Sequence, residues 1–140
     1  PVTIVYPHLN VLRVSPERLR RLEAPAFEAG VLAPLSVDGP FASAAVTLVI
    51  HCLPGPESRK AVAIRHVAEV LAPDGVLFGS TVLGEMGPHT TVSRAVLRAF
   101  NRRGAFDNLD DSAGSLRAIL ESAFDDVKIG PTDSTNSETN

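Results

Sequence analysis

Two residues that can do chemistry stand side by side at the end of an apolar run. The run, Ala44 to Cys52 (AAVTLVIHC), is rich in β-branched residues and ends on His51 and Cys52. Histidine titrates near neutral pH, so an imidazole at this position can serve as a general base. The competing interpretation is structural: a strand-end histidine bonded to a loop carbonyl, beside a small buried thiol. Both interpretations stay open, and under the first of them His51 is the candidate catalytic residue.

Composition narrows the classes of function. Cys52 is the single cysteine and the four histidines do not fall at metal-ligand spacings, so no metal site is expected. With 13 basic and 16 acidic residues, the chain has a net charge of -3 and lacks the cationic field that attracts nucleic acid. No apolar run reaches the roughly 18 residues of a membrane span, and no signal-like segment opens the sequence. These observations predict a cytoplasmic protein with neither a nucleic-acid partner nor a membrane segment.

The chain alternates between strands and helices. The run Val2 to Tyr6 (VTIVY) predicts a first strand, which ends before a proline that lacks an N–H. Ser15, followed by proline and glutamate, predicts the start of a helix that extends to about Leu22. A connection broken by proline and glycine follows, with room for a short edge strand near Ala26 to Glu28.

The central unit is strand, helix, strand. Ala44 to Cys52 is almost entirely apolar, which is typical of a parallel strand covered by helices on both faces. Glu57 to about Leu71 predicts an amphipathic helix, with Lys60 away from its inner face. The apolar run Val76 to Leu83 (VLFGSTVL) predicts a second strand, so the three elements form a βαβ unit. The inner positions of the helix are Ala61, Ile64, Val67, Ala68 and Leu71.

Two further helices and a last strand are predicted. Thr90 to Arg103 has apolar residues at helical spacing and is followed by Gly104, a typical C-terminal stop. Ser112 predicts the N-cap of another helix. A last strand is expected over Asp126 to Ile129. The apolar positions of the two helices are Val92, Val96, Ala99 and Phe100, and Leu116, Ile119, Leu120 and Ala123.

These elements carry a resemblance to a known family. FASAAVTLVIHCLPG (41–55) and VLAPDGVLFGSTVLG (70–84) resemble the fourth and fifth strands of class I S-adenosylmethionine-dependent methyltransferases of the small-molecule type. VTIVYPHLNVL resembles their second strand, and AGVLAPL (29–35) the segment after their third. The resemblance implies an α/β fold with a mostly parallel, Rossmann-like sheet, in a partial methyltransferase domain (1–129). After Gly130 the sequence has no apolar residue, so a polar disordered tail (130–140) is expected. It also implies methyl transfer from S-adenosylmethionine to a small-molecule acceptor.

The resemblance also implies a cofactor site in which three usual carboxylates are replaced. Tyr6 stands where the family has an acid that accepts hydrogen bonds from the cofactor ribose. Gly30 and Ala42 occupy two further positions at which an acid is common. The cofactor-binding residues that the resemblance implies are Tyr6, Gly30, Val31, His51 and Cys52.

The expected sheet is truncated, with its first and last strands absent. The family's first strand and glycine-rich loop would lie before Pro1, and the polar tail does not supply the last strand. The first strand normally lies between the second and the fourth. Those two strands therefore either pair directly or leave a gap that another polypeptide fills. The second case predicts a homo-oligomer or a second chain that completes the sheet.

Two other functions remain open. One is a catalytically inactive, truncated homologue that acts as a binding or assembly partner, which the replaced acids favour. The other begins at Pro1, because an N-terminal proline before a β run resembles the tautomerase superfamily, in which the secondary amine is an acid or base. Nothing downstream repeats the β-α-β pattern of that family. The residues interpreted either as turn residues or as substrate ligands are Asn101, Arg103, Asp107 and Asn108.

Overall fold

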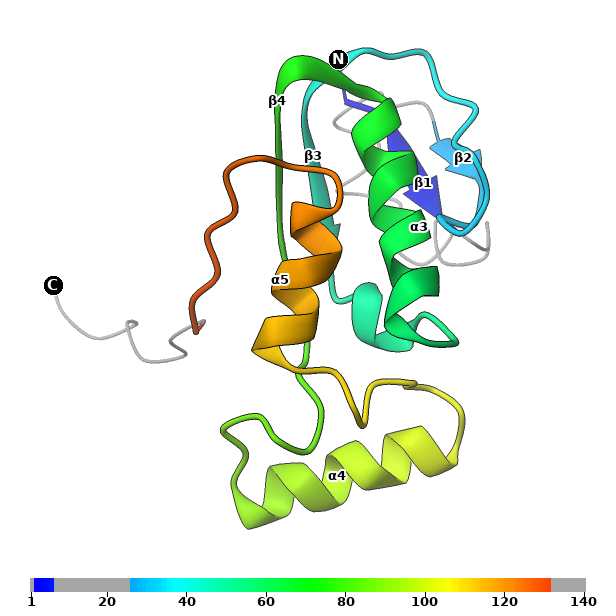
Figure 1. Cartoon of the computed structure of the whole chain (residues 1–140). Coiled ribbons are helices and arrows are strands. Elements are labelled where there is room, and N and C mark those ends of the chain that lie inside the picture. Colours follow the sequence, from blue (N-terminus) through cyan, green and yellow to red (C-terminus); the bar gives the residue numbers. More distant parts are fainter. Residues whose placement is uncertain (1, 7–25, 132–140) are drawn as a thin grey trace, which may run out of the picture.

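A computed structural model describes residues 2–6 and 26–131 of the chain (Figure 1). The helix predicted from Ser15 to Leu22 lies outside these residues. So does the predicted tail, apart from residues 130 and 131. No described helix is both long and apolar enough to cross a membrane.

The first sheet has two short strands. β1 (Ile4–Tyr6) and β2 (Ala26–Glu28) pair in parallel, with Tyr6 opposite Glu28. Both strands were predicted from their apolar residues and the flanking prolines, and both are confirmed. The second strand has the predicted bounds, whereas the first begins at Ile4 instead of Val2.

The second sheet is the predicted strand-helix-strand unit. β3 (Phe41–Thr47) and β4 (Leu71–Ser80) pair in parallel and are joined by helix α3 (Glu57–Glu69). The unit is confirmed, but both predicted strand boundaries were wrong. β3 begins at Phe41 and ends at Thr47, both earlier than predicted. It ends there because Leu48 has a φ of 57°, in the left-handed region, and turns the chain out of the strand. β4 begins at Leu71, since the Ala-Pro-Asp-Gly segment continues the strand instead of preceding it.

The core lies between this sheet and two helices on one of its faces (Figure 1). Helix α5 (Ala113–Glu121) lies beside α3, and Ser112 and Ser115 form a reciprocal capping box at its start. The predicted cap and inner face of α5 are both confirmed. The buried core residues are Ile50, Ala61, Ile64 and Ile119, and Val46, Leu77, Leu116, Leu120, Ala123 and Phe124 pack against them.

Helix α4 (Thr91–Arg102) is present where the sequence predicted it, but it buries a different face. Thr90 caps it, and Gly104 follows its end with a φ of 70°. Leu97 is its buried residue. The predicted inner face was wrong, because three of its four residues are exposed: Val92, Val96 and Phe100.

The strand predicted over Asp126 to Ile129 is absent from the described structure. These residues are irregular, and the carbonyl of Val127 accepts a hydrogen bond from the side chain of Arg117 instead of from a neighbouring strand. The short apolar pattern is therefore not enough to form a strand where no neighbouring strand pairs with it.

Candidate functional site

A tight turn after β3 determines where His51 points. Leu48 leaves the strand, although its N–H still donates to a carbonyl of β4, and the 3₁₀-helix η1 (Ile50–Cys52) follows. The turn directs the His51 side chain inward, so that the residue is only 3% exposed, and leaves Cys52 exposed. His51 and Cys52 thus lie just beyond the strand end instead of at its last residues.

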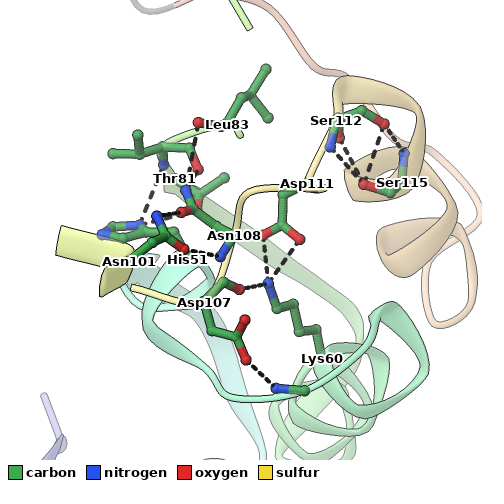
Figure 2. A network of polar contacts seen from close by, with 12 residues as sticks. His51, Lys60, Thr81, Leu83, Asn101, Asp107, Asn108, Asp111, Ser112 and Ser115 are labelled. Carbon is green, nitrogen blue, oxygen red and sulfur yellow. Dashed lines mark hydrogen bonds and ion pairs between the residues drawn. The ribbon is translucent and has the colours of Figure 1, made fainter. Parts of the chain in front are cut away.

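The His51 ring is held through its Nδ1 atom. Val82 N–H donates to Nδ1 at 3.3 Å, and Thr81 Oγ1 lies 3.3 Å from the same atom (Figure 2). Because an amide N–H only donates, Nδ1 accepts and the neutral ring carries its proton on Nε2. Burial lowers the pKa of His51, the charge of Lys60 lowers it further, and Asp111 acts in the opposite direction. His51 is therefore a neutral imidazole at pH 7.

Phe106 packs directly against His51. Their ring centroids are 4.4 Å apart at an interplanar angle of 79°, an edge-to-face arrangement. On its other side Phe106 stacks on Phe100 of α4, at 4.9 Å. Asp107 N–H donates to the His51 carbonyl at 2.9 Å. The segment after α4 is thereby fastened to the turn that carries His51.

A buried lysine ties this segment to α3. Lys60 is 1% exposed, and its Nζ donates to the Asp107 carbonyl and to both carboxylate oxygens of Asp111, at 2.8 and 2.6 Å (Figure 2). The Asp107 carboxylate accepts from Gly55 N–H at 2.7 Å. The outward position predicted for Lys60 was wrong. An ammonium group is buried here because a carboxylate and a carbonyl replace its water.

Two asparagines complete the network. Asn101 donates from Nδ2 to Asn108 Oδ1 at 2.9 Å, and Asn108 N–H donates to Asn101 Oδ1 at 3.1 Å. Asn108 is fully buried and also donates to the Val82 carbonyl at 2.8 Å (Figure 2). The contacts identify both residues as structural, which agrees with their interpretation as turn residues.

An open surface pocket of about 620 Å³ lies beside the network. Glu85 and Arg98 meet on its wall in a two-pronged ion pair, with Nε–Oε1 and Nη2–Oε2 distances of 2.5 and 3.1 Å. The hydrogen bond from Arg98 lowers the pKa of Glu85. The lining residues are Cys52, Pro54, Glu85, Arg98, Asn101, Arg102, Gly104, Phe106, Asp107 and Leu109.

The two adjacent candidates differ in their access to the pocket. Cys52 lines it, whereas His51 lies behind Phe106 and does not. Partial burial raises the pKa of the Cys52 thiol, with Lys60 acting in the opposite direction. Cys52 is therefore a neutral thiol at pH 7, which suits a contact residue better than a nucleophile.

The other predicted cofactor residues lie at the carboxyl end of the first sheet. Tyr6 ends β1, and Gly30 and Val31 follow β2. Gly30 is exposed and has nothing within 4 Å of its Cβ position. The Val31 carbonyl lies 3.0 Å from Nδ1 of His66 on α3. The five predicted residues are thus divided between the two sheets. Tyr6, Gly30 and Val31 lie at the carboxyl end of the first sheet, and His51 and Cys52 lie beyond the end of the second.

Sequence reasoning missed the residues that hold the pocket wall. Lys60 lies four positions before Ile64 and seven before Val67, so the spacing places it on the inner face. This spacing was available in the sequence, but a lysine is normally assigned to solvent. Phe106 and Asp111 gave no signal, since their contacts cross between segments far apart in the chain.

Comparisons with known proteins agree with this architecture. The chain is 34% identical over 124 residues to demethylluteothin O-methyltransferase of Streptomyces thioluteus, covering 88% of this chain and 54% of the relative. It is 38% identical over 103 residues to methyltransferase verB of Penicillium polonicum, covering 71% and 45%. It is 32% identical over 117 residues to N-methyltransferase vrtF of Penicillium aethiopicum, covering 80% and 48%. No protein-family model matches the chain.

The relatives and the fold support one assignment. The chain spans about half the length of the curated relatives that it matches. The tautomerase alternative depended on Pro1, which lies outside the described residues, and the relatives named here are methyltransferases. The parallel strands and the helices fit the truncated, Rossmann-like α/β fold that the resemblance implied, with the strands divided between two sheets. The chain therefore belongs to the S-adenosylmethionine-dependent methyltransferase family.

Proposed function

We propose that this chain forms the acceptor-binding part of an S-adenosylmethionine-dependent methyltransferase that methylates a small molecule. The observation that carries the proposal is the 34% identity to demethylluteothin O-methyltransferase over 88% of the chain. The pocket beside η1 supports it, because parallel sheets bind ligands beyond the carboxyl ends of their strands. The free thiol of Cys52 supports a reducing, cytoplasmic location.

The described residues fit the cofactor only in part. The carboxyl end of β1–β2 offers the exposed Glu28 opposite Tyr6 as an acceptor for ribose hydroxyls. Gly30 leaves open space, but the Val31 carbonyl already faces His66. No described segment forms a glycine-rich turn between a strand and a helix, the usual means of bringing backbone N–H groups to a cofactor. The described residues therefore do not enclose S-adenosylmethionine by themselves.

Methyl transfer requires chiefly that an acceptor atom be held in line with the methyl group. Phe106 gives the pocket wall an apolar contact, and the Glu85–Arg98 ion pair and the exposed Cys52 thiol offer polar contacts there. His51 supports this wall from behind through Phe106 and the Asp107 N–H. The general-base role of His51 stays a prediction, and it requires Nδ1, the ring atom with a lone pair, to release Val82 N–H before it takes up a proton.

The proposal is tested by methyl transfer from labelled S-adenosylmethionine to a panel of small phenols and amines, with this chain mixed with the segment of demethylluteothin O-methyltransferase that lies outside the match. Phe106→Ala is expected to lower kcat/KM at least about tenfold by removing the pocket wall. His51→Ala is expected to lower turnover while the protein stays folded. Val92→Ala is the matched control, since Val92 is exposed and does not line the pocket. Equal activity of all three variants would contradict the proposed site.

A further inference from the structure

Two arginines of helix α4 lie on the wall of the open pocket beside η1. Arg98 and Arg102 are four residues apart in α4, so they lie on the same face of the helix, one turn from each other. Both residues are exposed, and both line the pocket. The helix therefore presents two guanidinium groups to any molecule that occupies this pocket.

Arg98 is oriented by one partner and keeps donors to spare. Its Nε and Nη2 atoms donate to the two carboxylate oxygens of Glu85, which fixes the plane of the guanidinium group. A guanidinium group has more N–H donors than this pair uses. Nη1 makes no hydrogen bond within the described part of the chain. Arg98 can therefore bind a second acceptor without losing Glu85.

Arg102 has no ion-pair partner among residues 2–6 and 26–131. The cations that do form ion pairs in these residues are Lys60, Arg98, Arg117 and Lys128. Arg102 lies in the last turn of α4, where the negative end of the helix dipole favours a cation. The dipole explains a basic residue at this position, but it does not explain why this residue lines a pocket next to Arg98. A ligand with a negative charge accounts for the arrangement.

The acids of the pocket wall are already engaged. Glu85 is paired with Arg98 through both of its carboxylate oxygens. The Asp107 carboxylate accepts from Gly55 N–H at 2.7 Å, just before the start of α3, where the positive end of that helix dipole offsets its charge. Of the four charged residues that line the pocket, Arg102 is thus the one whose charge no neighbour in the wall offsets.

Another part of the wall is apolar. Pro54, Phe106 and Leu109 line the pocket together with the two arginines, and Leu109 is 39% exposed. An apolar surface beside two guanidinium groups suits a small molecule that has an apolar ring or chain and an acidic group. A carboxylate matches the planar guanidinium group in both shape and charge.

We propose that the acceptor bound in this pocket is a small aromatic or aliphatic acid, whose carboxylate pairs with Arg98 and Arg102. The inference deepens the proposed function and rests on it for the role of the ligand as methyl acceptor. The carboxylate is the anchor, and the apolar part of the ligand lies against Phe106 and Leu109. A phenol or an amine without an acidic group lacks this anchor and binds more weakly.

The test compares two probes of nearly the same shape, para-hydroxybenzoate and the neutral para-hydroxybenzamide. Their binding is measured by NMR titration of this chain at pH 7, because all the lining residues named above belong to it. The acid should bind at least about fivefold more tightly than the amide, which is the effect of one charge-assisted contact at an open site. The backbone signals of Arg102 and Leu109 should shift during the titration, which locates the probe in the pocket.

Two changes of charge at the site should act in opposite directions. Arg102→Gln should abolish the preference for the acid. Glu85→Gln should tighten binding of the acid at least about twofold, because it removes a competing anion and frees Arg98. An ion pair with a purely structural role predicts weaker or unchanged binding in Glu85→Gln. Neither side chain is buried, so both variants should fold, which circular dichroism checks.

Arg94→Gln is the matched control. Arg94 is exposed on the same helix, one turn before Arg98, but it does not line the pocket. The variant loses the same charge and should change the preference for the acid by less than about twofold, because exposed charges are screened by salt. An equal loss of preference in Arg94→Gln and Arg102→Gln would show that net charge, and not a direct contact, is responsible.

Three further results would overturn the proposal. They are equal binding or no binding of the two probes, a preference for the acid that persists in Arg102→Gln, and tighter binding of para-hydroxybenzylamine than of the acid. The readout is binding, so it is distinct from methyl transfer. Methylation of neutral phenols by a chain with no preference for the acid would contradict this inference alone, whereas preferential binding of the acid without any transfer would contradict only the proposed function.

Discussion

Lys60 Nζ lies 2.6 Å from Asp111 Oδ2 and so joins the first turn of α3 to the segment that precedes α5. The same ammonium group donates to the Asp107 carbonyl, within the segment that forms the pocket wall. A single buried cation thereby fixes the wall against the core. Its polar partners come from one short loop, which makes the loop depend on Lys60.

Removal of this cation should destabilise the protein strongly. Lys60→Met keeps most of the side-chain volume but leaves Asp111 without its partner, and we expect the free energy of unfolding to fall by about 3 kcal/mol. Arg117→Met is the control, because the pair of Arg117 with Glu121 is exposed and should contribute less than about 0.5 kcal/mol. Urea denaturation measures both. Equal effects of the two variants would contradict the buried network.

The buried asparagine should contribute through its hydrogen bonds. Asn108→Ala leaves the Val82 carbonyl and Asn101 Nδ2 without this partner, and we expect a loss of about 2 kcal/mol in the free energy of unfolding. Asp110→Ala, at an exposed position two residues on, should change it by less than about 0.5 kcal/mol. Thermal unfolding of the two variants checks the difference, and a loss as large in Asp110→Ala would point to a general effect of the loop.

His51 should make the protein less stable in acid. Its pKa in the folded state is lowered below the ordinary value of 6.5, mainly by burial. Below that value the unfolded chain takes up a proton that the folded chain does not, so stability is full above about pH 6.5 and falls as the pH drops toward the folded-state pKa.

The pH effect is measured by urea denaturation between about pH 7 and pH 5. His51→Gln retains an acceptor for Val82 N–H but does not titrate, so its stability should depend less on pH in this range. His66→Gln controls for the loss of a histidine elsewhere. A pH dependence of His51→Gln as steep as that of the unchanged chain would show that His51 is not the group responsible.

The cap of α5 offers a local test of the fold. Ser112 Oγ accepts from Ser115 N–H at 3.0 Å, and Ser115 Oγ accepts from Ser112 N–H at 2.8 Å. Ser112→Ala should lower the free energy of unfolding by about 1 kcal/mol. Ser112→Asp restores an acceptor and should recover most of the loss. An Asp variant as unstable as the Ala variant would contradict the capping role.

The elements that could be predicted from the sequence are those whose signals are local. The cap at Ser112, the stop at Gly104 and the apolar period of α3 each determine structure within a few residues. The structure confirms the cap, the stop and the inner positions Ala61, Ile64 and Val67, whereas Leu71, predicted at the end of the same face, begins β4. The end of β3 could not be predicted, because the residues after Thr47 are as apolar as the strand. Only the left-handed backbone at Leu48 ends it.

The candidate site was predictable only in part, for a related reason. His51 and Cys52 were singled out because they follow an apolar strand, and the turn after β3 does place them beside the pocket wall. The wall itself depends on contacts of Lys60 and Phe106 with residues distant in sequence. The predicted inner face of α4 was wrong because apolar spacing indicates an amphipathic face but not what covers it.

Cofactor binding tests the central claim most directly. The measurement is calorimetric titration of S-adenosylhomocysteine and S-adenosylmethionine into this chain, alone and in the presence of the segment of demethylluteothin O-methyltransferase that lies outside the match. We predict saturable binding with a Kd of about 1 mM or tighter once the segment is present, and weaker or no binding by the chain alone. An assembled complex that binds neither compound would contradict the claim that this chain is part of an S-adenosylmethionine-dependent methyltransferase.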